Sequence, residues 1–273
     1  MSEVTTLTTS FVSPGALDQV LDSAPDVTTE ITSEQRNSLA ERFRAVSLPS
    51  HRRLDAWMVE RASTHVTPFR WSPSTARRVL GNATLRYRLA HQVSAMAALD
   101  EVVVDHLSRA ATGYARRGSL SSWLCELSTA QLALVTSDAL NWSHSLEEVA
   151  RSVGGGLVEV ADSDAYYDVA TARTTLRGRR DLLVTKDEKR TIIRLRSGAP
   201  GRTAGAGLRA DLTIDAFSRP DGRAANQIIG VWPDAGLLLR VEGSLEDIKA
   251  GAKDLLRVAN LQHTTFYQRP LAS

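Results

Sequence analysis

The sequence predicts an α+β fold, with helices in the first half of the chain and strands concentrated in the second. Up to about residue 150, apolar residues recur at spacings of three and four, which is the period of an amphipathic helix. After Gly154-Gly155-Gly156 the period becomes that of strands, and the later strand signals are separated by helical ones. The predicted order is helices, three or four strands, a helix, two strands and a final helix.

Helices of the first half begin at serine, since serine caps a helix N-terminus and a following proline fits the first turn. We expect helices at 16–21, from Ser33, at about 51–63, from Ser72, at about 83–112 and at about 128–152. Gly81-Asn82 is expected to break or bend the chain before residue 83, and the three glycines from Gly154 end the sixth helix.

Strands of the second half are expected at 157–160, 164–169, 181–185, 191–196, 228–232 and 237–241. The polar segment Lys186–Lys189 joins two of these strands into a hairpin, and Pro233–Gly236 joins the last two. A loop rich in Gly, Pro and Ala is expected over 198–207. Helices follow at about 208–218 and about 245–260, the latter opened by a capping box at Ser244.

Composition is that of a globular protein: 42% of the 273 residues are hydrophobic and 23% are charged. No apolar run reaches the length of a membrane span, and the N-terminal residues lack the features of a signal peptide, so a cytoplasmic protein without a membrane partner is expected. The single cysteine, Cys125, excludes an internal disulfide and a cysteine-based zinc site. The six histidines show no metal-ligand spacing.

The change of period suggests a division of the chain into three parts. Residues 1–12 are rich in threonine and expected to be disordered. Residues 13–127 form a helical region, and residues 128–273 form a domain built on the strands.

Charge is distributed unevenly, although the formal net charge is only +2. Residues 1–50 carry seven acidic and three basic residues, whereas residues 173–209 carry eleven basic and three acidic ones. A basic block of this kind is what a polyanion-binding site needs. The alternative is a solvated basic surface without a partner.

Two motifs in the strand region carry a resemblance to a known family. Gly178-x-x-Asp181 opens one strand, and the next is an apolar strand that ends at Ser197-Gly198. The later segment from Ile229 to Asp234, followed by Gly236, completes the pattern. With the element order over 129–261, these motifs resemble the PD-(D/E)XK nuclease superfamily, in the branch of exonuclease-V-type helicase–nucleases and CRISPR-associated exonucleases. The resemblance implies a core of mixed β-sheet flanked by helices.

The resemblance also implies a metal site, from which this chain departs. Family members hold Mg²⁺ with an aspartate on one strand and an acid-x-Lys motif on the next. Here Asp181 is present, but Arg194 stands in the place of the acid and Arg196 in that of the lysine. A guanidinium has no lone pair for a metal. We therefore expect Asp181, a vestigial site residue, to pair with Arg194 or Arg196, with no metal and no cofactor.

The helical acid of the family corresponds to Glu147 or Glu148, and His144 shares a helix face with Glu148. An exposed helical surface is the alternative interpretation of these residues. The arginines expected to face phosphates lie on the hairpin and on the loop and helix that follow it. They are Arg179, Arg180, Arg194, Arg196, Arg202 and Arg209.

Three functions are consistent with these features. The first is a degenerate nuclease-fold protein that binds DNA non-specifically or supports a DNA-processing complex without cutting. The second is an active Mg²⁺-dependent DNA nuclease in which a migrated acid, Glu147, Glu148 or Asp211, joins Asp181. The third is an interaction scaffold whose helical half binds a protein partner.

Overall fold

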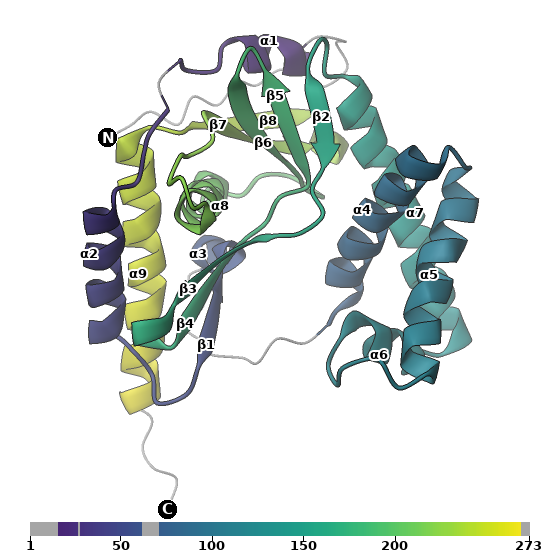
Figure 1. Cartoon of the computed structure of the whole chain (residues 1–273), viewed down its shortest axis with the longest axis horizontal. Coiled ribbons are helices and arrows are strands. Elements are labelled where there is room, and N and C mark those ends of the chain that lie inside the picture. Colours follow the sequence, from purple (N-terminus) through teal and green to yellow (C-terminus); the bar gives the residue numbers. More distant parts are fainter. Residues whose placement is uncertain (1–15, 27, 62–70, 269–273) are drawn as a thin grey trace, which may run out of the picture. The chain divides into compact units, whose positions relative to one another are not determined.

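The computed structural model describes residues 16–26, 28–61 and 71–268 and confirms an α+β fold (Figure 1). The chain divides into two compact units. The sheet unit comprises residues 1–68, 153–159 and 163–273, and the helical unit comprises residues 69–152 and 160–162. This division differs from the predicted boundary between residues 127 and 128. The helices at 33–45 and 56–61 belong with the strands, because their apolar residues join the core of the sheet unit.

The helical unit contains α4 (Pro73–His91), α5 (Ala95–Ala111), α6 (Leu120–Cys125) and α7 (Thr129–Arg151). Each helix is capped by a serine side chain. Its core is built from small and branched apolar residues: Ala76, Leu80, Leu99, Leu120, Leu124, Val135 and Ala139.

The predicted break at Gly81-Asn82 is wrong, because α4 continues through both residues. A Cβ at position 81 would lie only 2.7 Å from the Ala139 carbonyl oxygen, so glycine allows α7 to approach α4 closely. The predicted long helix is divided instead at Gln92, whose φ is 54°. Helix α6 was not predicted.

The sheet unit contains a three-stranded sheet in the order β1-β4-β3. Strand β1 (Arg52–Asp55) runs parallel to β4 (Thr174–Gly178), and β3 (Ala165–Val169) is antiparallel to β4. The predicted helix at 51–63 is therefore wrong in its first part. Leu54 is opposite Leu176 of β4, and Ala56–Arg61 form a helix, α3, whereas residues 62 and 63 of the predicted helix lie outside the described residues. Pairing with a distant strand overrides the local helical spacing.

The second sheet has five strands in the order β2-β5-β6-β7-β8. They are β2 (Leu157–Val160), β5 (Leu182–Lys186), β6 (Lys189–Leu195), β7 (Gln227–Trp232) and β8 (Leu237–Glu242). The β5–β6 and β7–β8 pairs are antiparallel, as the turns predicted, whereas β6 and β7 are parallel. Helix α8 (Ala204–Ser218) makes the crossover that parallel strands require. It begins within the segment predicted to be a loop.

Helix α8 packs against strands of both sheets and against α9 (Leu245–Gln268). Helix α2 (Ser33–Ala45) lies beside α9, and α1 (Ala16–Asp22) lies at the end of the five-stranded sheet (Figure 1). The interior of this unit is apolar around Phe43, Leu176, Leu208, Trp232 and Leu255. In the described part of the chain, no helix combines the length and the apolar character needed to cross a membrane.

Candidate functional site

The β5–β6 hairpin places the predicted site residues inside the sheet unit. Asp181 directly precedes β5, and its backbone N–H donates to the Ile193 carbonyl at 3.2 Å. Arg194 lies next to Ile193 on β6. The two strands are joined by Asp187 and Glu188, which both have positive φ, at 49° and 62°. A two-residue turn of this kind fixes the register of the hairpin and with it the position of Arg194.

Arg194 lies between two buried aspartates. Its Nε donates to Asp181 Oδ2 at 3.1 Å, and its Nη1 is paired with Asp211 Oδ2. The Leu195 backbone N–H also donates to Asp181 Oδ2, at 3.0 Å. All three charged side chains are less than 5% exposed. The prediction that Asp181 pairs with Arg194 or Arg196 is confirmed for Arg194. Of the acids named as possible companions of Asp181, Asp211 is the one that contacts the same guanidinium.

Asp211 and Asp215 explain how α8 completes the site. They are four residues apart and therefore share one face of the helix. Asp211 accepts from the Arg179 backbone N–H at 2.7 Å. Asp215 pairs with Arg190 at 2.7 Å and with Arg180 at 3.3 Å. Two aspartates spaced by four in a helix made mostly of apolar and small residues are the sequence signal that could have identified this face.

Burial and charge have opposite effects on the ionisation of these groups. Desolvation raises the pKa of Asp211 to about 6, although the nearby Arg194 guanidinium acts to lower it. Desolvation alone would lower the pKa of Arg194, but Asp211 and Asp181 outweigh it and the pKa is raised. Arg194 is therefore the permanent cation of this site.

A magnesium ion, which the family resemblance implies, does not fit these residues. Asp181 and Asp211 could supply carboxylate oxygens, but the Arg194 guanidinium lies between them and donates to both. It offers no lone pair to a metal. Among the residues that the structure describes, no group of three or more His, Cys, Asp or Glu side chains could hold a metal ion.

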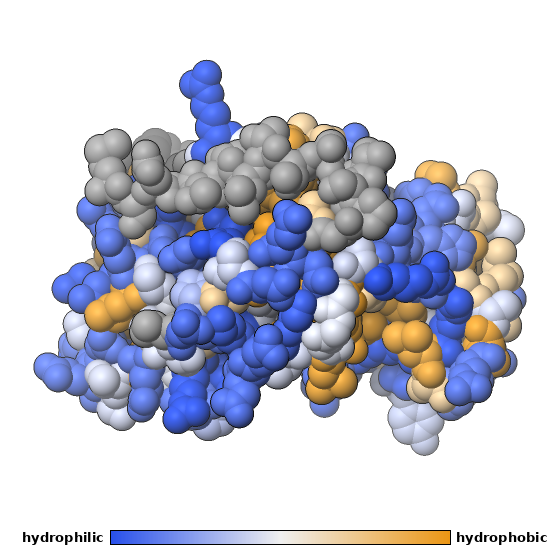
Figure 2. Space-filling model, turned by 90° about the horizontal axis from the view of Figure 1, so that it is seen from above, coloured by the Kyte–Doolittle hydropathy of each residue, from blue (hydrophilic) through white to orange (hydrophobic). Residues whose placement is uncertain are grey.

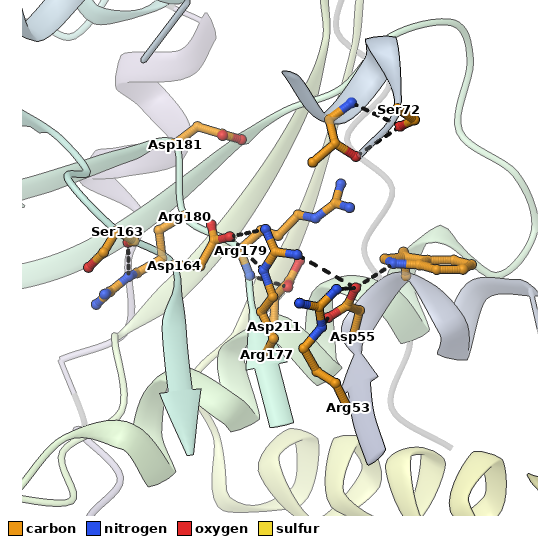
Figure 3. Close-up of polar contacts among 12 residues, drawn as sticks. Arg53, Asp55, Ser72, Ser163, Asp164, Arg177, Arg179, Arg180, Asp181 and Asp211 are labelled. Atoms are coloured by element: carbon orange, nitrogen blue, oxygen red, sulfur yellow. Dashed lines mark hydrogen bonds and ion pairs between the residues drawn. The ribbon is translucent and has the colours of Figure 1, made fainter. Parts of the chain in front are cut away.

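A second buried ion cluster lies where the chain passes from β4 to β5 (Figure 3). The Arg177 guanidinium lies 2.6 Å from Asp164 and 3.7 Å from Asp55. Asp55 also pairs with Arg53 at 3.0 Å and accepts from the Trp57 indole at 2.9 Å. Sequence reasoning missed this cluster, because its members come from strands β1 and β4 and the segment before β3.

Arg196 does not join the aspartates. Its Nη2 lies 2.5 Å from Glu60 Oε2 on α3, and its guanidinium lies over the Trp232 ring. It is nevertheless close enough to act on Asp211, because its positive charge acts to lower the pKa of that carboxyl against the larger effect of burial. The role expected for Arg196 as a partner of Asp181 is therefore filled by Arg194 alone.

Glu147 and Glu148 belong to the helical unit and not to the sheet unit. Glu147 is paired with Arg88 and Arg151; burial acts against its ionisation, but these two arginines outweigh it and lower its pKa. Glu148 and His144 are exposed on α7. The interpretation of Glu148 as part of an exposed helical surface agrees with this position.

The six arginines predicted to face phosphates differ in accessibility. Arg194 is buried between aspartates, so its assignment to phosphate binding is wrong. Arg180 pairs with Asp215, and Arg209 lies 3.8 Å from Asp254. Arg179 and Arg196 are half-buried, and Arg202 is exposed on the turn before α8. Judged by side-chain accessibility, Arg202 is therefore the best placed of the six to bind a phosphate.

The basic block is largely neutralised by acids from other parts of the chain. Lys186 pairs with Asp18 at 2.9 Å and with Asp22 at 2.6 Å, and Lys189 pairs with Asp26 at 2.6 Å. The acidic N-terminal segment and the basic hairpin thus complement each other. Part of the uneven charge distribution therefore reflects ion pairs within the protein.

Comparisons with known proteins add little to this geometry. No family model and no curated protein matches the chain. Among solved structures, the crystal structure of SSO0001 matches with a TM-score of 0.30 and 12% sequence identity, covering 86% of this chain and 88% of that one. A likeness this weak carries no argument about family or activity.

Proposed function

We propose that this chain is a nuclease-fold protein that has lost its metal chemistry and binds DNA without cutting it. One observation supports the loss of cutting above all others. The position where a nuclease of the resembling family would hold a metal contains the Arg194 guanidinium, paired with Asp181 and Asp211. A fixed cation of this kind stabilises the hairpin but cannot activate a water molecule for attack on a phosphate.

Binding in this proposal is electrostatic and independent of sequence. The segment after β6 carries the exposed Arg202, and Arg196, which is paired with Glu60. The chain before β5 carries Arg179 and Arg180, and Arg180 is paired with Asp215. Guanidinium groups suit phosphate oxygens, since their planar N–H groups can donate two parallel hydrogen bonds. Affinity should therefore fall as salt is added.

A cleavage assay tests the loss of catalysis. The protein is incubated with Mg²⁺ and linear, nicked or single-stranded DNA, beside the Asp181→Asn variant. We expect no cleavage by either protein. Cleavage by the natural sequence that is lost in Asp181→Asn would overturn the proposal.

A salt titration tests the binding. We expect Arg202→Ala to weaken duplex binding and to reduce the slope of log K against log salt by about 0.9, the value for one phosphate contact. Arg42→Ala, which removes an exposed arginine from α2, is the matched control and should leave the slope unchanged. Equal effects of the two substitutions would contradict the assigned surface.

Two alternatives are favoured by specific observations. Asp211 faces Asp181 across Arg194, which is the arrangement that a nuclease with a migrated acid would need if the guanidinium withdrew. Cleavage of DNA in the assay above would support this active nuclease, and absence of cleavage would count against it. An interaction scaffold is favoured by exposed apolar side chains of the helical unit. Figure 2 shows apolar surface, coloured orange, on this unit. They include Leu89, Met96, Val104 and Leu134. Absence of DNA binding at low salt would leave the scaffold.

A further inference from the structure

The ion pair between Arg196 and Glu60 lies at the surface of the sheet unit, unlike the buried pair at Arg194. Their side chains are 20% and 18% exposed, and the charged atoms are 2.5 Å apart. The Arg196 guanidinium lies 5.4 Å from the centre of the Trp232 ring, which holds it in a defined orientation. The pair is therefore partly open to solvent, although Oε1 of Glu60 is buried.

The Glu60 carboxylate is seated against the first turn of α8. A Cβ at Gly207 would collide with this carboxylate, so glycine is required for Glu60 to occupy its place. The Thr203 hydroxyl donates to the Glu60 carbonyl oxygen at 2.8 Å and fixes the end of α3 there. An anion at this position is favoured both by the Arg196 guanidinium and by the helix dipole.

The surroundings identify which anion could replace the carboxylate. Arg202, one residue before Thr203, is exposed. The acid that contacts the same loop, Asp234, accepts from the Gly198 backbone N–H at 3.0 Å. Phosphate oxygens make the same paired hydrogen bonds with a guanidinium as a carboxylate does. Arg196 and the exposed Arg202 lie on the same segment between β6 and α8, and they are the arginines of this segment that phosphates of a nucleic-acid backbone would contact.

We infer that Glu60 is an internal competitor for the phosphate that Arg196 binds in a complex with nucleic acid. This inference rests on the proposed DNA binding and adds a regulating residue to it. In the free protein the Glu60 carboxylate occupies the Arg196 guanidinium. DNA must displace this carboxylate, so the pair lowers the affinity of the natural sequence.

Duplex binding by variants that replace Glu60 or Arg196 with glutamine tests the inference. A short fluorescein-labelled DNA duplex is titrated with the full chain, with Glu60→Gln and with Glu60→Gln/Arg196→Gln over a range of salt. Glu41→Gln removes an acid that is paired with Arg44 on the exposed face of α2, and it controls for net charge. Thermal unfolding confirms that each variant is folded, and Glu60→Ala is a second variant at the same position.

We expect Glu60→Gln to raise affinity about tenfold, as gaining one charged hydrogen-bonded contact would, and to steepen the salt slope by about 0.9. The double variant should lose this gain. A gain equal to that of Glu41→Gln, or one that survives in the double variant, would overturn the inference and leave the proposed function intact. Binding by Glu60→Gln alone would support the inference. Absence of binding by every protein at low salt would contradict both the competition by Glu60 and the proposed DNA binding.

Discussion

At the scale of single residues, Arg194 decides what the site can do. Its guanidinium neutralises two buried aspartates. Water cannot take its place, because all three side chains are buried. A buried pair adds little stability when complete, because desolvation offsets the attraction between the charges. Removing one partner is costly, since the remaining charges stay buried.

Arg194→Ala is therefore expected to lower the free energy of unfolding by about 3–5 kcal/mol. Arg44→Ala breaks an exposed pair with Glu41 and should change it by less than about 1 kcal/mol. Urea denaturation of both variants measures the difference. Similar losses in the two variants would show that Arg194 does not hold the aspartates.

The raised pKa of Asp211 predicts that the free energy of unfolding depends on pH. Its pKa is about 6 in the folded protein, above the ordinary value of 3.8, so the folded state binds this proton more tightly than the unfolded state. The contribution of Asp211 to stability is fully present below about pH 4 and is lost as pH rises through 6. Asp211→Asn removes this dependence.

The stability of Asp211→Asn relative to the natural sequence should therefore rise between pH 4 and pH 7, by on the order of 2 kcal/mol. Urea denaturation at the two pH values measures it, and Asp221→Asn is the control. Arg219 lowers the pKa of Asp221 to about 2, so its contribution changes below this range. A relative stability of Asp211→Asn that is constant with pH would contradict the account.

At the scale of elements, the β5–β6 turn stores strain. Asp187 and Glu188 both adopt left-handed backbone conformations, in which a side chain costs about 1 kcal/mol and glycine costs little. Glu188→Gly is therefore expected to stabilise the protein by about 1 kcal/mol. Glu34→Gly, at an exposed position in α2, should destabilise it by about the same amount. Loss of stability in both variants would contradict the strain that we assign to the left-handed turn residues.

The elements also show what the sequence could predict. Local signals located the β5–β6 and β7–β8 hairpins and most helices, because turn residues and caps act over a few positions. They failed at β1 and β4, whose pairing joins Leu54 to Leu176 across the chain. They failed at Gly81 for the same reason, since the role of that glycine depends on Ala139 of another helix.

At the scale of the whole molecule, charge is balanced between distant segments. Two lysines of the basic block, Lys186 and Lys189, pair with Asp18, Asp22 and Asp26. Part of the charge that predicts a polyanion site is therefore neutralised within the protein. The family resemblance led us to expect Asp181 to pair with an arginine of the next strand, and it left open whether that arginine is Arg194 or Arg196. The sequence named Asp211 only as one of three acids that could join Asp181, and it did not locate Asp164 or Glu60, because it does not fix how α8, α3 and the two sheets pack together.

Anomalous diffraction from crystals soaked in manganese tests the central claim most directly. The account predicts no ordered manganese between Asp181 and Asp211, with the Arg194 guanidinium in contact with both carboxylates. Ordered manganese bound by these two aspartates, with Arg194 turned away, would contradict it.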